Sequence, residues 1–132
     1  MIDFEPLSAR IIGASFRVHN SLGPGHLESV YRNALAIELR KEGLKVLIED
    51  RIVVHYEKTP VGHCQADLLV EHQIVVECKA KICIMPGHEM RLAAYLNCSP
   101  YEVGLVLNFG ATRVEIKRVL RGKEDKHGGA VA

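Results

Sequence analysis

The hydrophobic positions in the first third of the chain follow helical spacing. A first pattern predicts a helix from about Ser8, a plausible N-cap, to Ser21. A second pattern runs through residues 27–39, and Gly43 is placed as its C-cap. Residues 22–25, Leu-Gly-Pro-Gly, separate the two, so two helices joined by a tight turn are expected. The apolar positions of the first pattern are Leu7, Ile11, Ala14, Val18 and Leu22.

The middle of the chain changes to patterns typical of strands. Residues 45–49 and 52–56 predict strand, which could be continuous with a kink near Asp50-Arg51, and residues 59–62, Thr-Pro-Val-Gly, predict a turn. Two short apolar runs follow, residues 64–70 and 74–80, separated only by Glu-His-Gln. This spacing predicts a β-hairpin buried on both faces.

The last third predicts one helix and one or two strands. A helix begins near Pro86-Gly87 and ends before residues 97–100, Asn-Cys-Ser-Pro. Residues 103–109 predict a buried strand, whereas residues 114–120 fit either an alternating edge strand or a short helix. The order of elements therefore indicates an α/β sandwich around a small mixed sheet.

Three charged residues interrupt the apolar hairpin. If Val70 pairs with Ile74, Asp67 falls opposite Glu77, and strand alternation puts Lys79 on the same face as Glu77. Charged side chains are rarely buried without partners. Two interpretations remain open on spacing alone: a divalent metal such as Mg²⁺ held by the two carboxylates beside the lysine, or an ordinary salt bridge to Lys79 at a solvated sheet edge.

Other polar residues also have two interpretations. Glu28, in the first turn of the second helix, either stabilises the helix dipole or supplies a third carboxylate. On the third helix His88, Arg91 and Tyr95 share one stripe, which faces either solvent or a substrate. The side chains expected to pack inward from this helix are Met90, Ala94 and Leu96.

Length, charge and cysteine content narrow the function classes. The 132 residues predict one domain over residues 1–120 and a flexible tail over 121–132. With 17 basic against 16 acidic side chains the formal charge is +1, which argues against a globally basic nucleic-acid-binding surface. Neither a membrane span nor a signal peptide is expected, so a cytoplasmic location is predicted. The four cysteines form no Cys-x-x-Cys pair and are predicted to be small core residues; a zinc or iron–sulfur site with His63 or His88 is the alternative.

The segment from Gly25 to Tyr31, Gly-His-Leu-Glu-Ser-Val-Tyr, resembles the Gly-x-x-Glu-x-x-Tyr signature of the GxxExxY proteins, a small branch of the PD-(D/E)XK nuclease superfamily. The resemblance extends over residues 11–120. It includes Ala-Asp-Leu-Leu-Val and Val-Glu-Cys-Lys-Ala in the hairpin, and Gly-Leu-Val-Leu-Asn-Phe in the later strand.

This resemblance implies a restriction-endonuclease-like, three-layer α/β core and a Mg²⁺- or Mn²⁺-dependent phosphodiesterase centre. By the family pattern, Asp67, Glu77 and the backbone carbonyl of Cys78 would hold the metal, and Lys79 would serve the attacking water. Glu28 would complete the acidic cluster. The residues expected on the substrate side are Tyr31, His88, Arg91 and Tyr95, Arg91 replacing the glutamine of the family's helix motif.

The function indicated is a metal-dependent nuclease that hydrolyses phosphodiester bonds in DNA or RNA. The alternative is a non-catalytic module that retains the fold and binds nucleic acid or protein. The complete set of Asp67, Glu77 and Lys79 favours the enzyme, whereas the near-neutral charge keeps the alternative open. A domain of this size has limited surface for a duplex, which is compatible with a homodimer.

Overall fold

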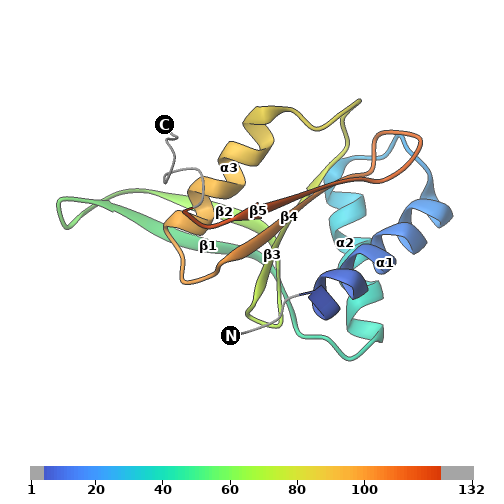
Figure 1. Ribbon diagram of the computed structural model, residues 1–132, viewed down its shortest axis with the longest axis horizontal. Helices are drawn as coiled ribbons and strands as arrows, with labels where there is room; N and C mark the ends of the chain where they lie inside the picture. Colours follow the sequence, from blue (N-terminus) through green and yellow to red (C-terminus); the bar gives the residue numbers. More distant parts are fainter. Residues whose placement is uncertain (1–4, 123–132) are drawn as a thin grey trace.

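The computed structural model describes residues 5–122, so the predicted tail lies outside the described residues from residue 123 onward. Three helices and five strands make up the described chain (Figure 1). In order they are α1 (Glu5–Leu22), α2 (Glu28–Lys41), β1 (Val46–Tyr56), β2 (Thr59–Val70), β3 (Ile74–Lys79), α3 (Pro86–Asn97), β4 (Val103–Asn108) and β5 (Glu115–Leu120). Residues 114–120 therefore resolve as an edge strand. Between residues 5 and 122 no helix is long and apolar enough to cross a membrane.

The five strands form one mixed sheet in the order β1-β2-β3-β4-β5. β3 and β4 are parallel, joined by α3, and the other neighbours are antiparallel. Figure 1 shows α1 and α2 together on one side of the sheet and α3 on the other, so the α/β three-layer arrangement is confirmed. The hairpin strand that carries Glu77 and Lys79 is the central strand, not an edge.

Two hydrophobic cores lie on opposite faces of the sheet. Alternation along β3 directs Val76 and Cys78 into the core under α1 and α2, and Val75 into the core under α3. The α3 layer lies close to β4 at Gly104, where an added Cβ would be 2.8 Å from Leu92 Cδ2. Glycine at this position therefore sets how closely α3 approaches the sheet.

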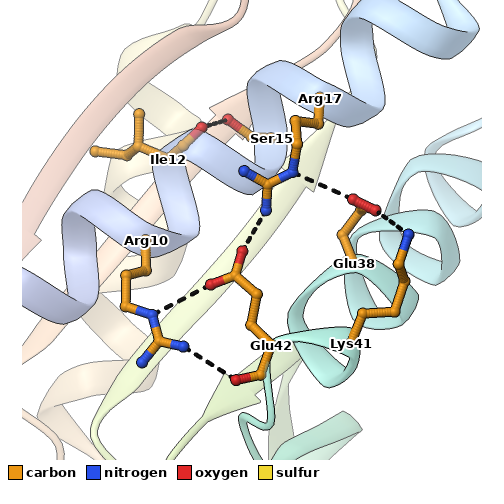
Figure 2. Close-up of polar contacts among 7 residues, drawn as sticks. All are labelled: Arg10, Ile12, Ser15, Arg17, Glu38, Lys41 and Glu42. Carbon is orange, nitrogen blue, oxygen red and sulfur yellow. Dashed lines mark hydrogen bonds and ion pairs between the residues drawn. The ribbon is translucent and has the colours of Figure 1, made fainter.

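Charged side chains join α1 to α2 on their outer surface (Figure 2). Arg17 lies between Glu38, at 3.3 Å, and Glu42, and Arg10 donates to the Glu42 carboxylate at 3.2 Å. Exposed pairs of this kind contribute little individually. The orientation of α2, the helix that carries Glu28, is set by the buried core that its residues Tyr31, Leu35 and Leu39 share with α1 and the sheet.

Several predicted boundaries need correction. α1 begins at Glu5, so Ser8 is not its N-cap: it lies inside the helix, buried, and its Oγ has no hydrogen-bond partner among the described residues. The turn of the long hairpin is Glu57-Lys58, both with positive φ, and Thr59 to Gly62 belong to β2. The C-cap of α2 is Glu42, so the prediction of Gly43 was one residue late; Gly43 follows the cap with φ 85° and donates to Arg40 O at 3.0 Å.

The inward face of α3 also differs from the prediction. Met90 is 70% exposed and Ala94 is exposed, whereas Leu92 and Leu96 are buried. The expectation that all cysteines lie in the core was wrong for Cys83 and Cys98, which are exposed. Short apolar stretches in a helix give a weak phase signal, and α3 has a polar residue on every side.

Candidate metal and substrate site

The predicted register of the hairpin is confirmed. Val70 pairs with Ile74, Leu69 with Val75 and Leu68 with Val76. The ladder stops there, one pair before Asp67 and Glu77. Beyond that point each carboxylate accepts from the other strand's backbone: Cys78 N–H donates to Asp67 Oδ2 at 2.7 Å, and Asp67 N–H donates to Glu77 Oε2 at 3.3 Å. Where the backbone pairing of β2 with β3 ends, side-chain oxygens thus take the place of the backbone acceptors.

The end of this pairing coincides with a change of face in β2. Leu68 and Val70 pack under α1 and α2, whereas Cys64 and Ala66 pack on the α3 side. Regular alternation would place all four on one face, so the alternation reverses at Asp67. The neighbouring strand is irregular at the same level, because Glu49 has φ 59° and the pair Glu49–Asp67 is absent between the paired residues Ile48–Leu68 and Asp50–Ala66.

Burial dominates the electrostatics of the carboxylate pair. It raises the pKa of Glu77 to about 8, helped by the negative charge of Asp67 and opposed by Lys79. Burial also raises the pKa of Asp67, against the Cys78 N–H bond and the positive charges of Lys79 and Arg32. Ionising both carboxylates together is costly, and a bound cation would lower that cost.

Lys79 and Glu28 flank the pair at the end of β3. Lys79 is only 9% exposed, an unusual degree of burial for a lysine. Glu28 approaches the chain just beyond it: Ala80 N–H donates to Glu28 Oε2 at 3.4 Å, and Lys81 Nζ lies 4.0 Å from the same oxygen. The solvated-edge interpretation of the hairpin charges is therefore wrong, since these residues end the central strand.

Glu28 does not complete a three-carboxylate cluster. Within residues 5–122 no three His, Cys, Asp or Glu side chains come close enough together to hold a metal ion, which applies equally to the cysteine-based alternative. The oxygen donors brought together are those of Asp67 and Glu77. Two carboxylates suit Mg²⁺, which keeps several of its own waters, so the donor set fits this ion.

A cavity of about 380 Å³ opens beside Glu77 on the α3 side of the sheet. Arg91 and Tyr95 line it, as does Ala94. Tyr95 is nevertheless 1% exposed, and its hydroxyl donates to Asp50 Oδ2. Its role in the cavity wall is therefore structural, and it exposes almost no surface to a ligand. The other lining residues are His63, Cys64 and Gln65.

Two residues predicted on the substrate side, Tyr31 and His88, have structural roles instead. Tyr31 has no exposed surface; its ring stacks on Phe109 at 4.7 Å, and its hydroxyl donates to Gly23 O at 2.5 Å. His88 is not among the cavity's lining residues, and its Nδ1 accepts from Met85 N–H at 3.0 Å, capping α3. The expected contact of Tyr31 with substrate is therefore wrong. Its hydrogen bond holds the turn that places Glu28.

Arg32 is a site residue that sequence reasoning missed. It lies one turn after Glu28 on α2, is 18% exposed and pairs with Glu49 Oε2 at 2.8 Å. Its positive charge lowers the pKa of Asp67. The signal in the sequence was its spacing of four residues from Glu28, which puts both on one face of the helix.

Asn108 and Glu115 fix the connection that follows Lys79. The Asn108 amide donates to Lys81 O at 3.0 Å and to Glu115 Oε1 at 2.8 Å, and Asn108 Oδ1 accepts from Lys81 N–H at 2.9 Å. Gly110 is required beside them, since a Cβ there would lie 2.3 Å from Lys81 O. The segment leaving the candidate site is therefore held by partly buried polar contacts.

Comparison with known proteins agrees with this architecture. Residues 5–119 match the family model of the PD-(D/E)XK nuclease superfamily. The crystal structure of SSO0001 superposes with a TM-score of 0.59 at 16% identity, covering 92% of this chain and 61% of that one. This chain thus spans about three fifths of the length of SSO0001, and the similarity concerns the fold. An alkaline exonuclease, LHK-Exo from Laribacter hongkongensis, gives a TM-score of 0.46 at 14% identity, with 90% and 82% of the two chains covered. No curated protein matches the chain.

Proposed function

Because the chain belongs to the PD-(D/E)XK nuclease superfamily, we propose that it is a metal-dependent nuclease that hydrolyses phosphodiester bonds in DNA or RNA. The observation that carries the proposal is the partly buried pair of Asp67 and Glu77, each bonded to the other's strand and adjoining the buried Lys79. We place the chain in the GxxExxY branch on the Gly25 to Tyr31 segment.

Asp67, Glu77 and the backbone carbonyl of Cys78 would hold Mg²⁺ or Mn²⁺. When bound, such an ion polarises a phosphoryl oxygen and acidifies a coordinated water. The charge of the ion would favour the ionised form of both carboxylates, and the protein's part is to fix their orientation toward the ion. The Cys78 N–H, at 2.7 Å from Asp67 Oδ2, does this for Asp67.

Lys79 would act on the attacking water and on the charge of the phosphoryl group. Lys79 is 9% exposed, so its side chain has little freedom and is oriented before substrate arrives. Glu28 has a positioning role through Ala80 N–H, which holds the backbone immediately after Lys79. Arg91, on the cavity wall, would contact a substrate phosphate.

The proposal is tested by titrating Mg²⁺ and Mn²⁺ in cleavage assays on single- and double-stranded DNA and RNA. Cleavage should require the metal and should be abolished in Lys79→Ala, while metal affinity is retained or increased because a nearby cation is removed. If the wild type binds Mg²⁺, cleaves nothing, and Lys79→Ala binds nucleic acid equally well, the non-catalytic module is the better assignment.

A further inference from the structure

The cavity beside Glu77 adjoins the carboxylate pair but is otherwise built from different elements. Its walls come from β2 and α3, and Glu77 is the residue of the pair that lines it. Its volume of about 380 Å³ lies at the low end of small-ligand sites, roughly 300–1,000 Å³. A cavity of this size suits one small planar group and is too small for a duplex.

One wall is a strand edge with an unusual property. β2 pairs with β3 only over Leu68 to Val70, but continues to pair with β1 as far as Thr59. Among the described residues, the stretch from His63 to Gln65 therefore has a strand partner on one side only, and these residues line the cavity. A free strand edge presents both N–H and C=O groups. The edge of an unpaired nucleobase carries donors and acceptors of the same kind.

The opposite wall supplies a cation and open space. Arg91 and Ala94 are exposed on α3, one with a guanidinium and one with only a methyl group. Guanidinium groups stack on bases as well as bind phosphates. Contacts to the phosphate backbone of a nucleic acid would alone give this chain weak affinity for it, since the formal charge of the chain is only +1. Binding must therefore come from a localised, well-shaped contact.

We infer that this cavity receives a single unpaired nucleotide, with its base between the free edge of β2 and α3 and its phosphate beside Glu77. The inference rests on the proposed nuclease function and names its substrate class. The preferred substrate is single-stranded nucleic acid, or the single-stranded end of a duplex, and blunt duplex is disfavoured.

The test fills the cavity without touching the carboxylates. Ala94→Leu adds bulk to the α3 wall, and Ala9→Leu is the matched control, the same change at an exposed helical alanine on the other face of the sheet. Binding of fluorescent single strands of DNA and RNA, and of a blunt duplex, is measured by anisotropy with Ca²⁺ in place of Mg²⁺. Cleavage of the same probes is measured in Mg²⁺.

Ala94→Leu should weaken single-strand binding by about 5- to 100-fold, the change expected when one stacked base is lost, and leave duplex binding unaltered. Ala9→Leu should behave as wild type. A single abasic position scanned along the strand should reproduce the loss at one position only. Arg91→Gln should weaken binding and flatten its salt dependence.

The two proposals fail in different ways. Cleavage with no strand preference, and with Ala94→Leu equal to Ala9→Leu, would overturn the nucleotide cavity and leave the nuclease intact. Absence of cleavage, combined with weaker single-strand binding in Ala94→Leu, would remove the nuclease and retain the cavity as a binding site. Absence of both effects would overturn both proposals.

Discussion

The carboxylate pair should make the metal-free protein less stable as pH rises, and Glu77→Gln should remove the part of that dependence that comes from Glu77. The pKa of Glu77 is about 8 in the folded protein against an ordinary value of 4.5. Below pH 4.5 the carboxyl is protonated in both states and contributes nothing. Between 4.5 and 8 the unfolded chain releases the proton while the folded chain keeps it, so the free energy of unfolding falls.

The magnitude follows from the shift. One pKa unit corresponds to about 1.4 kcal/mol, so the shift of Glu77 amounts to roughly 5 kcal/mol at pH above 8, a large part of the stability of a small domain. Glutamine has the same shape, can still accept from Asp67 N–H and cannot ionise. The variant should match the wild type at pH 4 and be the more stable protein at pH 9.

Urea unfolding of both proteins from pH 4 to 9, with EDTA and with Mg²⁺, measures these effects. Mg²⁺ should stabilise the wild type at pH 8, by about 2.7 kcal/mol at a concentration 100 times Kd, and stabilise Glu77→Gln much less. If the free energy of unfolding varied with pH in the same way for both proteins, the raised pKa of Glu77 would be refuted. Equal stabilisation by Mg²⁺ would show that the ion binds somewhere other than Glu77.

Three further substitutions test the scaffold around the site. Ser8→Ala should raise the free energy of unfolding by about 1 kcal/mol in urea titrations, because it removes a buried hydroxyl that has no hydrogen-bond partner within residues 5–122; unchanged or lower stability would contradict this. Gly110→Ala should lower it by at least about 2 kcal/mol, since its Cβ would overlap Lys81 O, whereas Gly62→Ala, with no atom within 4 Å, should change it little. Tyr31→Phe keeps the stacking on Phe109 but loses two hydrogen bonds of the hydroxyl, the one it donates to Gly23 O and the one it accepts from His26 N–H. Stability should therefore fall by about 1 kcal/mol or more, with KM for nucleic acid unchanged; a raised KM at full stability would return Tyr31 to the substrate side.

The sequence predicted most of the fold because its elements are marked by local signals. Gly43, with positive φ, follows the C-cap of α2, and the three-residue break between two apolar runs gives the Val70–Ile74 register. Where local signals were weak the prediction failed. Ser8 has the chemistry of an N-cap, but it lies buried inside α1. The tip of the long hairpin is formed by Glu57 and Lys58, which are not typical residues for positive φ.

The arrangement of the site itself required the three-dimensional structure. Simple alternation predicted Asp67 and Glu77 side by side on one face of a regular hairpin. In the structure they meet because the hairpin stops being regular: β2 changes face at Asp67, and Glu49 on the next strand adopts positive φ at the same level. Such a reversal depends on the partner strand as well as on residues 64–70, so no pattern within that run could reveal it. The same irregularity separates β2 from β3 and leaves the edge from His63 to Gln65 without a strand partner on that side among the described residues. The carboxylate pair and the adjoining cavity therefore have one structural cause, and a substitution that restored regular pairing at Asp67 should remove both.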